Sequence, residues 1–205
     1  MVTRASGDAV PDRGLAAAAR ALRAGLVVAL PTDTVYGLAV DPTQPGATDR
    51  LFAAKRRPHD VDLPVLVAGV DQALQLAASV PEIAVRLMDR FWPGPLTVVL
   101  PRSPEFTGDL GDDEATVGVR CPAHPVPRAL CAEVGPLATT SANRHGQPTH
   151  ETAAAVEADL GREVAVVIDG GTCAGRPSTV VDCTGVEPKL LREGRVPWAD
   201  VLAAF

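Results

Sequence analysis

Aromatic residues are scarce in this 205-residue sequence, at 3%, so aliphatic side chains must fill most of the core. The same scarcity argues against a surface on which single-stranded nucleic acid would stack. Basic residues are outnumbered 19 to 25 by acidic ones, which leaves a formal net charge of −6. This balance disfavours a general polyanion-binding surface, so any phosphate ligand must meet a local cluster of positive charge.

The sequence also lacks a C-x-x-C pair among its four cysteines, Cys121, Cys131, Cys173 and Cys183. His124 lies close to Cys121, but no second close pair completes a zinc site. This usage favours a reducing, cytoplasmic compartment. Residues 1–13 are polar and charged, unlike a signal peptide, and no apolar run approaches the roughly 20 residues that a membrane span needs. We therefore expect a cytoplasmic protein that does not enter a membrane.

Sequence signatures of nucleotide and acyl chemistry are absent as well: G-x-x-x-x-G-K-[ST], G-x-G-x-x-G and G-x-S-x-G. The histidines, at positions 59, 124, 145 and 150, lie in polar contexts typical of solvated loops rather than of a catalytic base. A covalent mechanism therefore has little support.

Short apolar runs alternate with amphipathic stripes along the chain, which predicts an α/β fold with a mixed sheet in one domain, residues 1–205. Residues 102–115 are polar and acidic, and predict an exposed loop. We expect helices at 15–22, 47–54, 83–91, 126–134 and 153–160. We expect strands at 25–29, 63–67, 96–100, 116–120, 137–139, 164–168, 179–181 and 190–192.

The stretch after the first expected strand, residues 30–38, carries the clearest functional signal. Pro31 cannot donate to a sheet ladder, so the strand should end there, and α/β sheets bind ligands at strand ends. If the backbone stays extended, Thr32 and Thr34 project to one side and Asp33 to the other, beside the only tyrosine, Tyr36. The alternative is a helix start with Thr32 or Asp33 as its N-cap.

Polar side chains share one face in several other expected strands, because alternate residues of a strand point the same way. Each pattern on its own also suits a solvated strand face or a turn. Lys55 and Arg57 join the pattern if the chain is extended before Pro58. Together the patterns predict one polar, partly cationic surface suited to a phosphate and a small zwitterion. Its members are Lys55, Arg57, Thr116, Arg120, Thr139, Ser141, Ser178, Asp182 and Arg192.

Seven ordered motifs between residues 13 and 196 resemble those of the YrdC-like threonylcarbamoyl-AMP synthases. They are PTDTVYGL (31–38), KRRP (55–58), WPGPLT (92–97), VGVR (117–120), TSAN (140–143), PSTVVD (177–182) and LREG (191–194). The resemblance implies a twisted mixed α/β sheet flanked by helices, with a concave, positively charged face. It also implies a reaction in which the amine of L-threonine takes up CO2 or bicarbonate. The resulting carbamate attacks the α-phosphate of ATP, and pyrophosphate leaves.

The resemblance further implies Mg²⁺ carried by the triphosphate, no protein-held metal, and a later hand-off of the product to a tRNA threonylcarbamoyl transferase complex. It implies that Lys55 and Arg57 meet the phosphates and act electrostatically in catalysis. L-threonine would contact Thr34, Arg120, Thr139 and Ser178. Further ATP contacts would come from Thr116, Ser141, Asn143, Thr149 and Arg192, with Thr149 resting on its spacing from Ser141.

The sequence departs from the family pattern at Val61, Asp62 and Leu66, so no contact is assigned there. It ends at Phe205, without the C-terminal domain that some members carry over the pocket. Two alternatives remain open. One is a double-stranded RNA-binding module, against which the net charge and the single basic run at 55–57 weigh, although a weak RNA contact is compatible. The other is a protein of the same fold with another carbamoyl or acyl acceptor, or none.

Overall fold

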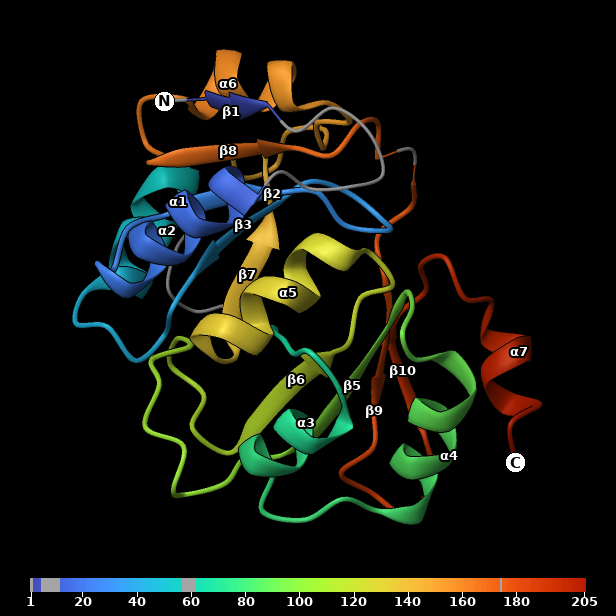
Figure 1. The fold of residues 1–205 in the computed structure, drawn as a ribbon. Helices are drawn as coiled ribbons and strands as arrows, with labels where there is room; N and C mark the ends of the chain where they lie inside the picture. Colours follow the sequence, from blue (N-terminus) through green and yellow to red (C-terminus); the bar gives the residue numbers. More distant parts are fainter. Residues whose placement is uncertain (1, 5–11, 57–61, 174) are drawn as a thin grey trace.

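Hydrogen bonds join strands of both directions into one sheet in the computed structural model, which describes residues 2–4, 12–56, 62–173 and 175–205 (Figure 1). The strands of the described residues are β1 (Val2–Arg4), β2 (Val28–Leu30), β3 (Gly37–Val40), β4 (Val65–Leu66), β5 (Leu96–Pro101), β6 (Thr116–Arg120), β7 (Leu137–Ser141), β8 (Val166–Asp169), β9 (Thr179–Asp182) and β10 (Lys189–Arg192). Their order across the sheet is β1-β8-β2-β3-β7-β4-β6-β5-β9-β10.

The sheet is mixed, as predicted. The pairs β1/β8, β2/β8, β4/β6 and β5/β9 are parallel, and the remaining neighbours are antiparallel. All the strands expected from the sequence are present, although β4 is shorter than the apolar run that contains it. Two strands, β1 and β3, were not predicted. Strand β3 is buried along its whole length between β2 and β7, so it shows no alternation of polar and apolar residues.

The helices of the described residues are α1 (Asp12–Arg23), α2 (Ala47–Lys55), α3 (Val70–Leu76), α4 (Glu82–Phe91), α5 (Pro125–Val134), α6 (Ala153–Leu160) and α7 (Trp198–Leu202). The five predicted helices are all present. Helices α3 and α7 were missed because each is too short to show an amphipathic stripe; α3 buries only Ala73 and Leu76. No helix in the described part of the chain is long and apolar enough to cross a membrane.

Helices cover both faces of the sheet, and alternate residues of a strand pack into different layers. In β2, Val28 and Leu30 pack with α1 and α5, whereas Ala29 packs into the larger core that includes α2, α4 and α6. In Figure 1, α1 and α5 lie over the β2 and β7 part of the sheet. On the strands beyond β4, the larger core receives Val117, Val119 and their neighbours. The other face of those strands is the floor of the site described below.

The loop predicted to be exposed, residues 102–115, is irregular as expected but is not fully solvated. Leu110 is 1% exposed, and its carbonyl accepts a hydrogen bond from the Leu63 N–H at 2.8 Å. The Arg102 guanidinium donates to the carbonyls of Phe106, Gly108 and Asp113. The prediction of an exposed loop therefore holds for much of the segment and is wrong for its buried residues, Ser103, Gly108 and Leu110. The sequence did not show that one apolar residue among acidic ones would anchor the loop in the core.

Candidate active site

A cavity of about 580 Å³ lies over strands β5, β6, β7, β9 and β10, a size that suits a small-molecule ligand. Strand ends and connecting loops form its walls, as expected for ligand sites of α/β sheets. Many of the residues singled out in the sequence line it together. They are Thr34, Thr116, Arg120, Thr139, Ser141, Thr149, Ser178 and Arg192.

The segment between β2 and β3 is bent rather than extended, and no helix follows it. Thr32 Oγ1 accepts from the N–H groups of Thr34 and Val35, both at 3.1 Å, and donates to Val35 O at 2.6 Å. Both sequence-based alternatives, an extended strand and a helix N-cap, are therefore wrong. The threonine hydroxyls nevertheless meet, 2.9 Å apart. Because Thr32 has donated its only hydroxyl proton, Thr34 is the donor in this contact.

Arg120 holds the Thr34 hydroxyl from the other side. Its Nη1 donates to Thr34 Oγ1 at 2.9 Å, its Nη2 to Asp33 Oδ1 at 2.7 Å, and its Nε to Gly94 O at 3.0 Å. Arg120 is only 6% exposed. Burial lowers the pKa of Arg120, and the Asp33 carboxylate opposes that effect. The guanidinium therefore both orients Thr34 and keeps positive charge beside the cavity.

Asp33 is the counter-ion of Arg120, a role that the sequence did not reveal. Its Oδ1 also accepts from the Ala123 N–H at 3.1 Å, whereas its buried Oδ2 has no hydrogen-bond partner among the described residues. Arg195 donates to the backbone carbonyl of Asp33. Gly175 packs against this loop so closely that a Cβ there would lie 2.5 Å from Thr34 O. These contacts restrict the loop that carries Thr34.

Ser178 lies at the entry to β9 and is held by two neighbouring strands. Its Oγ is 2.9 Å from Thr97 Oγ1 of β5, and Arg192 Nη2 of β10 donates to it at 3.1 Å. Arg192 also donates to Ser178 O through Nε at 3.2 Å and Nη2 at 3.0 Å. Burial lowers the pKa of Arg192. Thr97 lines the cavity and was missed as a site residue, although it closes the WPGPLT motif.

Lys55 does not line the cavity but contacts residues at its edge. It is the last residue of α2, so the expectation that it lies in an extended segment is wrong. Its Nζ donates to Ser141 O at 2.7 Å, to Asn143 O at 2.8 Å and to Asn143 Oδ1 at 3.0 Å. Asn143 likewise lies behind Ser141, whose Oγ donates to Asn143 Oδ1 at 2.6 Å. Arg57 lies outside the described residues.

The hydroxyls of the predicted residues Thr139 and Thr116 donate to a neighbouring strand and to the loop before β6. Thr139 Oγ1 donates to Leu38 O at 2.9 Å, across the β3/β7 ladder. Thr116 Oγ1 donates to Asp113 Oδ2 at 2.6 Å, and this bond lowers the pKa of Asp113. Asp62 lines the cavity and accepts from the Asp113 N–H at 3.1 Å; burial raises its pKa. Asp182, which the strand pattern also singled out, is absent from the cavity lining and caps the turn at Thr184.

The fold and this cavity define an α/β protein whose site presents hydroxyls and guanidinium groups that suit an anionic small molecule. Residues 20–194 match the Sua5/YciO/YrdC family model, which carries the description "Telomere recombination". The match covers most of the chain, and the chain belongs to this family.

Relatives and a solved structure agree with that assignment. A Mycobacterium tuberculosis relative is 42% identical over 90% of this chain and 86% of its own length. A Bacillus subtilis relative named "Threonylcarbamoyl-AMP synthase" is 42% identical over 90% of this chain. A crystal structure of Pyrococcus abyssi Sua5 with L-threonine superposes with a TM-score of 0.89, at 36% identity over 100% of this chain. This chain spans 54% of the Bacillus protein and 60% of the Pyrococcus chain.

Proposed function

We propose that this chain condenses L-threonine, CO2 or bicarbonate, and ATP to L-threonylcarbamoyladenylate and pyrophosphate. The observation that carries the proposal is that one cavity joins the cluster of Thr34, Arg120 and Ser178 to the polar edge at Ser141 and Thr116. The name of the Bacillus relative and the L-threonine bound to Pyrococcus Sua5 support it.

The reaction forms a C–N bond and an O–P bond, releases one amine proton to solvent, and breaks the P–O bond between the α-phosphate and the leaving pyrophosphate. The threonine amine adds to CO2 and loses a proton, which yields a carbamate. A carbamate oxygen then attacks the α-phosphorus of ATP, and the bond to the bridging oxygen breaks as pyrophosphate leaves with the electron pair. No protein atom becomes covalently attached. The protein accelerates this chemistry by holding two anionic reactants together and by placing donors where negative charge develops.

The threonine end would lie at Arg120, Thr34, Thr139 and Ser178. Three of the five N–H groups of Arg120 are engaged by described residues, which leaves two for a carboxylate. Thr34 accepts from Arg120 and donates to Thr32, so one lone pair remains for a substrate N–H or O–H. The site therefore offers donors for the acid group and an acceptor for the amine side.

The nucleotide end would lie at Ser141, Thr116, Thr149 and Arg192. Asn143 and Lys55 would support it from behind Ser141, and Arg57 would supply further positive charge. Magnesium would enter with the triphosphate and neutralise part of its charge. Asp62 is the only carboxylate among the described cavity residues, so phosphate oxygens and water would supply most of the metal ligands. Removal of divalent metal with EDTA should therefore abolish pyrophosphate release, and added Mg²⁺ should restore it.

The product is a mixed anhydride that hydrolyses readily, so it calls for prompt transfer to an acceptor. We propose hand-off to a tRNA threonylcarbamoyl transferase complex in the cytoplasm, with at most weak direct contact to RNA. The four free, buried cysteines are compatible with a reducing compartment.

The deciding experiment is an assay of pyrophosphate release with ATP and Mg²⁺, in which L-threonine and bicarbonate are omitted in turn. We expect release only with both present, and a product with the mass of threonylcarbamoyladenylate. Release that is indifferent to threonine would point instead to a protein of this fold with another acceptor. Salt-dependent binding of duplex RNA without ATP chemistry would favour the RNA-binding alternative.

Arg57 offers a residue-level test with a neighbouring control. Arg57→Ala should lower kcat/KM by about 100-fold or more, since an oxyanion partner is lost. Arg56→Ala removes the same charge from the exposed C-cap residue that follows α2, and it should change kcat/KM by less than about threefold. Equal effects of the two substitutions would contradict the role of Arg57.

A further inference from the structure

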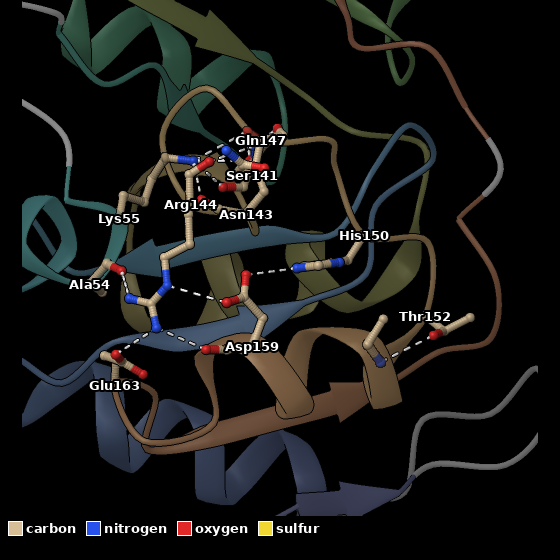
Figure 2. Close-up of polar contacts among 11 residues, drawn as sticks. Ala54, Lys55, Ser141, Asn143, Arg144, Gln147, His150, Thr152, Asp159 and Glu163 are labelled. Atoms are coloured by element: carbon tan, nitrogen blue, oxygen red, sulfur yellow. Dashed lines mark hydrogen bonds and ion pairs between the residues drawn. The ribbon is translucent and has the colours of Figure 1, made fainter.

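Arg144 lies between the C-terminal ends of two helices, α2 and α6 (Figure 2). Its Nη1 donates to Ala54 O of α2 at 2.9 Å, and its Nη2 donates to Asp159 O of α6 at 2.9 Å. Carbonyls in the last turn of a helix lack intrahelical donors and carry partial negative charge. One guanidinium therefore donates to carbonyls at two helix ends, and its positive charge interacts favourably with the negative ends of both helix dipoles.

Two carboxylates hold the same guanidinium in one orientation. Arg144 Nε donates to Asp159 Oδ1 at 3.2 Å, and Nη2 donates to Glu163 Oε1 at 2.8 Å. The second oxygen of Asp159 lies 2.9 Å from His150 Nε2. The bond to Glu163 raises the pKa of Arg144, and the bonds from His150 and Arg144 lower the pKa of Asp159. Figure 2 shows these side chains converging from α6, from the turn that follows it and from the loop that follows β7.

The loop after β7 and the end of α2 hold each other. The His145 N–H donates to Lys55 O at 2.9 Å, so consecutive carbonyls at the end of α2, those of Ala54 and Lys55, receive their donors from this loop. In the opposite direction, Lys55 Nζ donates to the carbonyls of Ser141 and Asn143. The placement of the ammonium group therefore depends on the contacts that Arg144 and His145 make with the helix end.

Both ends of this loop reach the cavity. Ser141, before the loop, and Thr149, next to His150, line the cavity, whereas Arg144 is absent from its lining. Arg144 can therefore affect a bound ligand only through these neighbours.

We propose that Arg144 is a positioning residue for the nucleotide side of the cavity, where it fixes Lys55, Ser141 and Thr149 relative to one another. This inference rests on the proposed function, because it assigns those residues to ATP. It adds a residue that touches neither substrate. The effect of removing Arg144 should therefore fall on ATP and largely spare L-threonine, because Thr34, Arg120 and Ser178 lie on other segments. Of the proposed threonine contacts, only Thr139 shares β7 with Ser141.

A purely structural role for Arg144 predicts a different pattern. Partly exposed ion pairs stabilise a fold modestly, and their loss would lower the thermal midpoint without discriminating between substrates. The useful measurement is therefore the change in KM for ATP compared with the change in KM for L-threonine. Both should be measured at a temperature where circular dichroism shows the variant to be folded.

The test compares Arg144→Gln with Arg23→Gln. Arg23 is a matched control because it also donates to a carboxylate and a backbone carbonyl, both of Glu133, far along the chain and away from the cavity. We expect Arg144→Gln to raise KM for ATP by about tenfold or more, since small misplacements of contacting groups have large effects. KM for L-threonine should change by less than about threefold, and Arg23→Gln should change neither. Arg144→Lys, which keeps the charge but not the four-acceptor geometry, should recover only part of the loss.

A second variant and a direct binding measurement keep the inference testable if Arg144→Gln folds poorly or the wild-type chain proves inactive. Asp159→Asn removes the negative charge of the carboxylate that contacts both Arg144 and His150. It should raise KM for ATP by a smaller factor than Arg144→Gln does. Calorimetric titration with a non-hydrolysable ATP analogue should show the same order of affinities without any turnover. An inactive wild-type chain that still binds the analogue would overturn the proposed function alone. Equal changes in both KM values, or unchanged analogue affinity in the Arg144 variants, would overturn the positioning role.

Discussion

Replacing Arg120 with methionine should destabilise the fold by about 3–5 kcal/mol, since it leaves a buried carboxylate without its counter-ion. The Asp33 carboxylate would retain one described donor, the Ala123 N–H at 3.1 Å, while Thr34 Oγ1 and Gly94 O would lose theirs. Methionine fills much of the same volume, so the loss reports charge and hydrogen bonding more than a cavity. With a typical urea m-value of about 2 kcal/mol/M, the unfolding midpoint should fall by about 2 M.

Urea unfolding followed by tryptophan fluorescence and by circular dichroism would measure this loss and test two-state behaviour. A double-mutant cycle with Asp33→Asn should show coupling, because the second substitution removes the charge that the first one strands. The double variant should therefore lose less stability than the sum of the single variants. Arg86→Met is the control: Arg86 pairs with Glu82 on the exposed face of α4, and its loss should cost less than about 1 kcal/mol. A loss below about 1 kcal/mol in Arg120→Met, or strictly additive losses, would refute the reasoning.

Two further substitutions test neighbouring parts of the site. Thr97→Val removes the hydroxyl that contacts Ser178, and it should raise KM for L-threonine about tenfold with little change in KM for ATP. Thr97→Ser keeps a hydroxyl and should behave like the wild type. Initial rates of pyrophosphate release measure both KM values, and equal effects of the two substitutions would contradict this role. Tyr36→Phe removes the hydroxyl that donates to Gly171 O at 2.7 Å and accepts from the Gly170 N–H, and it should cost about 1 kcal/mol near neutral pH. Burial raises the pKa of Tyr36 from 10.0 to about 12, so the folded state favours the neutral phenol. Wild-type stability should therefore be intact below pH 10 and fall as the pH rises toward 12. Urea titrations across that window should show the stability advantage of the wild type over Tyr36→Phe shrinking. A constant advantage would contradict this.

Local patterns predicted most of the secondary structure because they depend on side chains within a few residues of each other. The stripe in residues 15–22 became α1, and most of the apolar runs became buried strands, with the exposed β10 as an exception. The failures involve elements whose stability comes from distant partners. Strand β3 exists because β2 and β7 pair with its two edges, and no local signal reveals such pairing. Lys55 is helical because α2 continues to the residue before Arg56, whose left-handed conformation ends it.

Much of the candidate site could be predicted because strand alternation determines which side chains share a face. Thr116 and Arg120 on β6, and Thr139 and Ser141 on β7, line the cavity as that rule requires. The rule could not identify the partners of these residues. Asp33 as the counter-ion of Arg120 and Thr97 as the neighbour of Ser178 are contacts between residues more than eighty positions apart, as the separations of 87 and 81 show.

The sequence by itself determined the class of fold, the family, and the chemical character of the site, since these follow from the order and spacing of hydroxyl, guanidinium and apolar residues. Only the tertiary structure decided that Lys55 reaches the cavity edge through Ser141 and Asn143, and that Arg144 joins the ends of α2 and α6. The physical reason is that helix-end carbonyls and buried charges take whichever donors the folded chain brings near. Those donors come from segments that no local pattern connects.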